Sequence, residues 1–303
     1  MTIVITSCTN RKRKAITAGL HMASVADGDL PAVAAAWGAL LRGSQERYAA
    51  ADLYGGRSFQ EAAGAAKALE ADFLVVSAGL GLIDNKTAIP AYRCTVLGDA
   101  DDSVRARVQG HFSSAAWWAA LREMSPFAQP LATLVQRSNG LILVALSDAY
   151  LEMLAPEIAG LSADALARVR IFTRAPKRRV ALDLLPLMMP YDDRLDGPDS
   201  SIRGTRGDFA SRALAHFAGL QFTGSATEDS ALVSAALHNW RLPTKVERSR
   251  HDDAALVSLM HEHWDSVNGS SSRLLRLFRD DLGVACEQSR FAELARQVRG
   301  ERF

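Results

Sequence analysis

The chain has 303 residues, of which 48% are hydrophobic and 23% charged, and its formal net charge is +1. These values exclude a disordered or fibrous protein and allow about two globular domains. The three cysteines, Cys8, Cys94 and Cys286, are far apart, so we expect neither a disulfide scaffold nor a metal site.

No apolar run approaches the roughly 20 residues of a membrane span. The N-terminus enters a strand pattern at once instead of forming the apolar region of a secretory leader. We therefore expect a cytoplasmic protein, and the sequence predicts no cofactor.

Residues 2–6 predict the first strand, which is followed by small polar residues and then by four cations at 11–14. Such a strand end suits a pocket for a polar heterocycle or sugar beside a polyanion. A solvated basic turn is the alternative. The candidates are Ser7, Cys8 and Thr9 for substrate, and Lys12 and Arg13 for nucleic acid.

Helices are predicted next, one from Pro31 towards Tyr54 and another capped by Ser58. The apolar run at 73–77 then predicts a buried strand. Gly79 and Gly81 follow it and would let a substrate approach the backbone. Asp84 comes just beyond them and is a candidate catalytic carboxylate, because ligands bind past the carboxyl ends of parallel strands. An ordinary strand-to-helix turn is the alternative.

A third strand at 140–145 ends in Ser147 and Asp148. We assign Ser147 to the substrate and Asp148 to catalysis, although helix capping would also explain this aspartate. A fourth strand at 169–173 leads to a basic loop with Lys177 and Arg178, which are candidates for binding nucleic acid. The alternation of strands and helices predicts a three-layer α/β/α domain with a mostly parallel sheet over residues 1–222.

An irregular polar stretch at 190–208 contains Arg203 and Arg206, which would clamp phosphates if this is not simply a mobile loop. From residue 223 to 303 the pattern is helical only. Arg273, Arg276 and Arg279 recur every three residues there, which predicts a helix-turn-helix-like domain that binds DNA. A solvated face partly neutralised by nearby aspartates is the alternative.

Four short motifs together resemble the YaaA-type family. They are the Ser-Cys-Thr strand end with its lysine and arginine, Asp52-Leu-Tyr54 with Phe59, Val-Ser-Ala-Gly-Leu-Gly-Leu, and Ile-Pro-Ala-Tyr92. Relatives of that family include the accessory domain found beside archaeal tRNA-guanine transglycosylases. The resemblance covers about the first half of the chain and implies a fold similar to that of uracil-DNA glycosylases. The chain departs from the pattern at Asn10, where many relatives carry a lysine, and at Arg93, where an acidic residue is usual.

The expected function is that of a DNA N-glycosylase that receives a flipped, modified base from double-stranded DNA. Asp84 or Asp148 would stabilise the oxocarbenium-like state, and Tyr54 and Tyr92 would stack on the base. The likeness to glycosylases of this fold implies that Asn10 would instead position the attacking water. A likeness to anti-phage glycosylases suggests glucosylated hydroxymethylcytosine as the base, and hence antiviral defence. One alternative is a non-enzymatic DNA-binding or stress-protection protein, because YaaA-type proteins are implicated in oxidative stress. The other is an accessory protein of RNA or DNA base modification.

Overall fold

The computed structural model describes residues 1–98, 100–244 and 247–302. The chain divides into two compact units, Met1–Pro243 and Thr244–Phe303. This boundary lies later than the one expected after residue 222. The reason is helix α9 (Ala226–Ala236), whose buried Asp229 pairs with Arg170 of the sheet and so belongs to the first unit.

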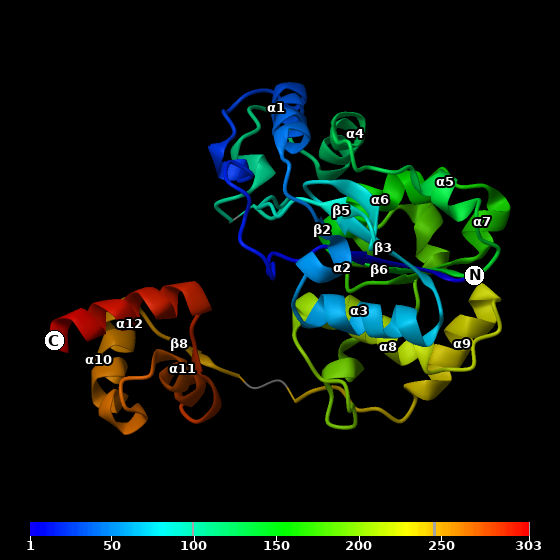
Figure 1. The fold of residues 1–303 in the computed structure, drawn as a ribbon. Coiled ribbons are helices and arrows are strands. Elements are labelled where there is room, and N and C mark those ends of the chain that lie inside the picture. The colour runs from blue at the N-terminus through cyan, green and yellow to red at the C-terminus, as the bar shows by residue number, and fades with distance from the viewer. Residues whose placement is uncertain (99, 245–246, 303) are drawn as a thin grey trace. The chain divides into compact units, whose positions relative to one another are not determined.

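The first unit is a mixed α/β structure around a five-stranded, mostly parallel sheet in the order β4-β3-β1-β6-β7 (Figure 1). This confirms the expected fold class at that level. Four strands are parallel, and the edge strand β4 runs antiparallel to β3. Their bounds are β1 Ile3–Ser7, β3 Asp72–Ser77, β4 Gly81–Asp84, β6 Ile142–Ala145 and β7 Val169–Phe172.

Helices cover both faces of the sheet (Figure 1). Helices α3 (Arg57–Ala68) and α8 (Phe209–Ala218) pack together on one face. Helices α4 (Ser114–Met124) and α6 (Asp148–Ala159) pack together on the other, and α1 (Leu30–Gly43) packs against α4. The shorter elements are α2 Ala50–Leu53, α5 Leu131–Val135, α7 Ala163–Ala167, β2 Tyr48–Ala49 and β5 Ala88–Ile89.

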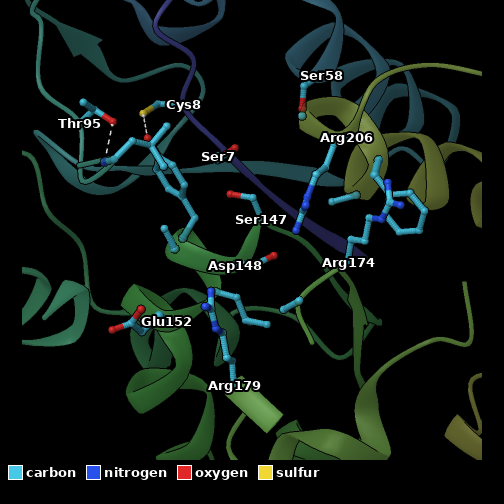
Figure 2. A pocket seen from close by; sticks show the side chains of 18 of the residues that line it. Ser7, Cys8, Ser58, Thr95, Ser147, Asp148, Glu152, Arg174, Arg179 and Arg206 are labelled. Carbon is cyan, nitrogen blue, oxygen red and sulfur yellow. Dashed lines mark hydrogen bonds between the residues drawn. The ribbon is translucent and has the colours of Figure 1, made fainter. Parts of the chain in front are cut away.

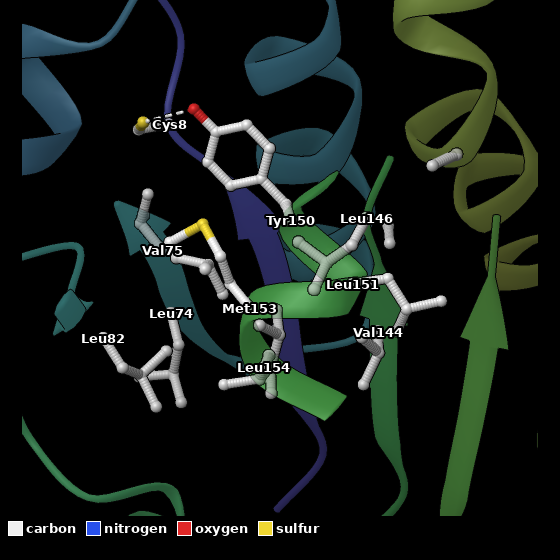
Figure 3. Close-up of a cluster of buried hydrophobic side chains, with 14 of the residues drawn as sticks. Cys8, Leu74, Val75, Leu82, Val144, Leu146, Tyr150, Leu151, Met153 and Leu154 are labelled. Carbon is white, nitrogen blue, oxygen red and sulfur yellow. Dashed lines mark hydrogen bonds between the residues drawn. The ribbon is translucent and has the colours of Figure 1, made fainter. Parts of the chain in front are cut away.

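The strands form where the sequence has short apolar runs, because each strand is buried on both faces. Ile142, Leu143 and Val144 of β6, for example, are fully buried. Figure 3 shows how helix α6 adds to this core from one face, with side chains that include Tyr150, Leu151, Met153 and Leu154.

Two predicted helix boundaries are wrong. The helix that begins near Pro31 ends at Gly43 instead of continuing towards Tyr54, and Ser44 is its C-cap. Ser58 does not cap α3, because Gly56 with a φ of 97° takes the N-cap position. The Ser58 hydroxyl instead lies 2.9 Å from the hydroxyl of Ser211 on α8.

Two arginines are completely buried in the first unit. The Arg170 Nε lies 2.8 Å from the Asp229 carboxylate. Arg212 lies 2.6 Å from Asp208 and 2.9 Å from Asp196, and it also donates hydrogen bonds to backbone carbonyls of the 195–205 segment. The polar stretch at 190–208 is therefore anchored on a buried cation.

The second unit is a small helical cluster, as expected, with one short two-stranded ladder in addition. Its buried side chains include Leu256, Met260, Leu274, Phe278 and Phe291. The elements are β8 Ser249–Arg250, α10 Asp253–His263, α11 Ser271–Asp280, β9 Val284–Ala285 and α12 Gln288–Arg302. Within the described parts of both units, no helix combines the length and the apolar character needed to cross a bilayer.

We predict that Asp229→Ala strongly destabilises the first unit, because it leaves the Arg170 cation buried without its partner. Breaking a buried pair in this way costs roughly 3–5 kcal/mol. Urea unfolding followed by circular dichroism would measure the loss. Asp199→Ala is the matched control, because it breaks an exposed pair with Arg241 and should change stability little. Similar behaviour of the two variants would contradict the anchoring role of the buried pair.

Candidate functional site at the carboxyl edge of the sheet

A pocket of about 650 Å³ lies beyond the carboxyl ends of β1, β6 and β7 (Figure 2). Ser7, Cys8, Thr9 and Asn10 reach it from β1. Its other polar residues are Ser58, Thr95, Ser147, Asp148, Tyr150, Glu152, Arg174, Arg179 and Arg206.

The topology of the sheet explains this position. The chain leaves β1 towards β3 on one side, and β6 lies on the other side of β1. Neighbouring parallel strands whose connections leave in opposite directions open a crevice at their carboxyl ends, where ligands bind in open α/β sheets. The register Thr6↔Ala145 brings the ends of β1 and β6 to the same level.

The N-terminal end of α6 supplies the acidic side of the pocket. Ser147 is the N-cap residue, but its hydroxyl makes no capping hydrogen bond. Asp148 is the first residue of the helix, and no ion pair or side-chain hydrogen bond occupies its carboxylate among the described residues. Glu152 follows one turn later and lines the same pocket. Two carboxylates without a capping role therefore face one cavity.

The floor of the pocket contains Cys8 and Tyr150. The Tyr150 hydroxyl lies 3.3 Å from the Cys8 sulfur, and both residues are buried. Burial raises the pKa of Tyr150 well above its ordinary value. Tyr150 therefore keeps its proton at physiological pH and offers a hydroxyl to the pocket.

Three arginines, Arg174, Arg179 and Arg206, also line the pocket. In Figure 2 the Arg206 side chain points towards Ser147 and Asp148. Arg174 is held by Asp193 at 2.6 Å and lies over the Phe209 ring at 5.6 Å. Arg206 and Arg179 are exposed, and neither takes part in an ion pair within the described ranges. An anionic group at the mouth of the pocket would meet these free guanidinium groups.

A second, smaller pocket of about 370 Å³ adjoins the first, because Asn10 and Thr95 line both. Lys12 lines it as well. The Lys12 amine lies 4.9 Å from the Tyr54 ring centre and 4.5 Å from that of Tyr92, and it donates to the Thr9 carbonyl. Burial lowers the pKa of Lys12. Lys12 was expected to contact nucleic acid, but the structure places its amine against the rings of Tyr54 and Tyr92.

Asp84 lies outside the site, contrary to expectation. The chain turns back after β3 as a hairpin, so that β4 pairs antiparallel with β3 and Asp84 lies beside Leu74. Strand β4 is three positions away from β6, which separates Asp84 from the end of β6 by about 14 Å across the sheet. The Asp84 carboxylate accepts a hydrogen bond from the Lys86 amide and so closes a local turn.

The expected substrate roles of Tyr54, Tyr92, Gly79 and Gly81 are also not supported. Both tyrosines are fully buried, and their hydroxyls lie 2.8 Å apart. Position 79 has no room for a side chain, because a Cβ atom there would lie 2.7 Å from the Tyr92 ring. Gly81 has a φ of 87°, which the hairpin turn requires. None of the four lines the larger pocket, and Tyr92 is the one among them that lines the second pocket.

The other predicted residues divide into three groups. Ser7, Cys8, Thr9, Asn10, Ser147, Asp148 and Arg206 come together in the larger pocket. Arg13, Lys177, Arg178 and Arg203 are exposed residues of the first unit that do not line it. Arg273, Arg276 and Arg279 belong to the second unit.

The prediction missed several residues that line the larger pocket, among them Glu152, Arg174 and Arg179. Two of them carried a signal. Glu152 is four residues after Asp148, and this spacing puts both on one face of a helix. Arg174 comes directly after the fourth strand, where the rule applied to the other strand ends holds equally. Ser58 and Thr95 reach the pocket only through tertiary packing, so no local pattern marks them.

Within the described residues, no group of three or more His, Cys, Asp or Glu side chains is placed to hold a metal ion. Comparisons with protein-family models, with curated proteins and with solved structures find no match to this chain. The function of this chain is therefore inferred from the site itself.

We predict that Arg206→Gln weakens binding of a nucleoside monophosphate by about tenfold or more, because one hydrogen bond to a charged group contributes roughly 1.5–3 kcal/mol. Isothermal titration calorimetry would measure the dissociation constant of the nucleoside monophosphate for each variant. Arg203→Gln removes the same charge from the same loop outside the pocket and should leave affinity unchanged. Equal losses of affinity in the two variants would mean that Arg206 acts only through the overall electrostatic potential of the protein and does not contact the phosphate.

Proposed function

We propose that this protein is a DNA N-glycosylase that hydrolyses the bond between deoxyribose and a modified base flipped into the larger pocket. One observation carries the proposal. Asp148 and Glu152, two carboxylates on one helix face, line a pocket at the switch point of the sheet, together with the exposed Arg179 and Arg206. Carboxylates suit a cationic sugar, and arginines suit the phosphates on either side of it.

The reaction needs both parts of this arrangement. As the bond from C1′ to the base nitrogen breaks, its electron pair leaves with the base and positive charge develops on the sugar. Asp148 would stabilise that charge and accept a proton from the attacking water, whose oxygen bonds to C1′. Asn10, on the neighbouring strand end, would orient the water, and Glu152 would add a second negative charge.

The lining also supports a base that carries hydroxyl groups. Ser7, Thr9, Ser58 and Thr95 bring hydroxyls into the larger pocket, and the second pocket adjoins it through Asn10 and Thr95. The larger pocket alone is within the usual range for small-molecule sites. Together the two suit a nucleobase with a bulky polar substituent, such as the glucosylated hydroxymethylcytosine that the sequence resemblance suggests.

An exposed leucine at the pocket favours duplex DNA as the substrate. The Leu182 side chain is 81% exposed and directly follows Val180 and Ala181, which line the pocket. Arg178 and Arg179 precede it. Apolar side chains beside cations are used to enter a base stack and hold it open. Leu182 would take the place of the flipped base.

The uracil-DNA-glycosylase likeness implied by the sequence motifs agrees with this proposal. A non-enzymatic DNA-binding role is the alternative that a specific observation favours. Lys177, Arg178 and Arg203 are exposed outside the pocket and would bind DNA whether or not a base is excised. Measurement of excision separates the two functions.

We predict that Asp148→Asn lowers base excision by about 100-fold or more, the usual scale for losing one group that stabilises a transition state. The protein is incubated with unmodified DNA and with phage DNA carrying glucosylated hydroxymethylcytosine. Heating in alkali then reveals abasic sites as strand breaks. Asp84→Asn is the control, because it changes the same chemical group away from the pocket.

The outcomes of this assay are distinct. Excision by wild type and Asp84→Asn, but not by Asp148→Asn, supports the proposal. Full excision by Asp148→Asn contradicts the assigned role of this carboxylate. Retained DNA binding without excision of any base tested would favour the non-enzymatic alternative.

We also predict that Leu182→Ala slows excision from duplex DNA about tenfold or more, since extruding a base costs a few kcal/mol that the wedge helps to offset. Excision from single-stranded DNA should stay within about twofold, because no stack has to be opened. Leu242→Ala is the control, since Leu242 is 62% exposed in the same unit but is not next in sequence to any residue that lines the pocket. An equal loss on both substrates would rule out a wedge.

A further inference from the structure

A second cationic cavity lies entirely within the unit Thr244–Phe303. It measures about 600 Å³ and is lined by Ala285, Cys286, Glu287 and five basic residues: Arg248, Arg250, His251, Arg279 and Arg290. We call it the arginine hollow. The base-excision proposal above makes no use of it.

Four elements, β8, β9, α11 and α12, build the hollow. Strand β8 brings Arg250 and pairs in parallel with β9, which leads into Cys286. Arg279 lies in the last turn of α11 and donates a hydrogen bond of 3.1 Å to the Cys286 carbonyl. Arg290 lies near the start of α12 and is 2.6 Å from Asp253. Residues that are distant in the sequence are thus fixed around one cavity.

The positive charge of the hollow is only partly compensated. Arg290 is paired with Asp253, and Arg248 is 3.8 Å from Asp280. Arg250 makes no ion pair within the described ranges. Glu287 is the one carboxylate among the lining residues, and it accepts a hydrogen bond from Ser289. A net positive charge therefore faces an open cavity.

The chemistry of the lining indicates what it would bind. Guanidinium groups match phosphate oxygens in pairs, and the first amides of α12 add donors near Arg290. His251 is the only ring among the lining residues, so the hollow offers almost no surface on which bases could stack. Recognition of phosphate groups without recognition of bases is what such a lining supports.

We propose that the arginine hollow binds consecutive phosphate groups of a DNA strand, as an anchor separate from the pocket of the first unit. This differs from the sequence-based expectation of a stripe formed by Arg273, Arg276 and Arg279. The first two are exposed on α11 outside the hollow, whereas Arg279 turns towards Cys286 and lines it.

The two arginine sets allow a matched test in the full-length chain. Arg248→Gln with Arg250→Gln removes two charges from the hollow. Arg273→Gln with Arg276→Gln removes two charges from the same unit outside it. Fluorescence anisotropy with an unmodified labelled DNA oligonucleotide would give affinities at several salt concentrations.

We expect the hollow variant to bind about tenfold or more weakly and its salt dependence to fall by roughly one unit for each lost phosphate contact. The matched variant should bind within about twofold of wild type. Equal losses in both variants, or no loss in the hollow variant, would overturn the proposal. Circular dichroism checks that both variants are folded. Arg250→Lys keeps the positive charge but not the planar guanidinium group, so this variant should lose only part of the DNA affinity.

Cys286 provides an independent measurement. It lines the hollow and is partly exposed, whereas Cys8 and Cys94 are buried, so alkylation should report on Cys286 first. Burial raises the pKa of the Cys286 thiol, so the reaction is best run at mildly alkaline pH.

Unmodified DNA should slow alkylation of Cys286 in proportion to the bound fraction, in wild type and in Asp148→Asn alike. This outcome would stand even if no base is ever excised. Protection by inorganic phosphate alone, with none by DNA, would mean a site for a small free anion and would overturn the proposal.

Discussion

The parallel register of β1 between β3 and β6 is the constraint on which the first unit depends. Because the chain leaves β1 in one direction and returns on its other side as β6, a crevice opens between the ends of these two strands. Ser7 to Asn10 and Ser147 to Asp148 reach this crevice simply by following their strands. The polar side chains are thus gathered by backbone hydrogen bonding, which tolerates many changes of side chain.

The cationic side of the pocket depends on a different interaction. Arg212 is buried and holds Asp208, Asp196 and several backbone carbonyls, and this fixes a stretch with little regular structure. Arg206 belongs to that stretch, so its position over the pocket follows from Arg212. The sheet therefore positions Asp148, whereas the buried ion pairs of Arg212 position Arg206.

Much of the fold was predictable because its strands are short apolar runs and its helices follow recognisable signals. The direction of β4 was not predictable in the same way. Two glycines after a buried strand are compatible with a turn into a helix or into a hairpin, and the packing of Gly81 against Ala128 became visible only in three dimensions. This one choice moved Asp84 away from the site. The sequence alone also could not predict the positions of Tyr54 and Tyr92, since an aromatic residue near a strand end can face a ligand or the core.

Gly79 has a consequence that reaches beyond the hairpin. Its missing side chain gives the Tyr92 ring its place, Tyr92 supports Lys12, and Lys12 holds the carbonyl of Thr9 beside Asn10. A single added methyl group would therefore press on a chain of contacts that ends at the wall shared by the two pockets. In related sequences the residue at this position should therefore vary together with the residue at 92, although neither residue lines the larger pocket.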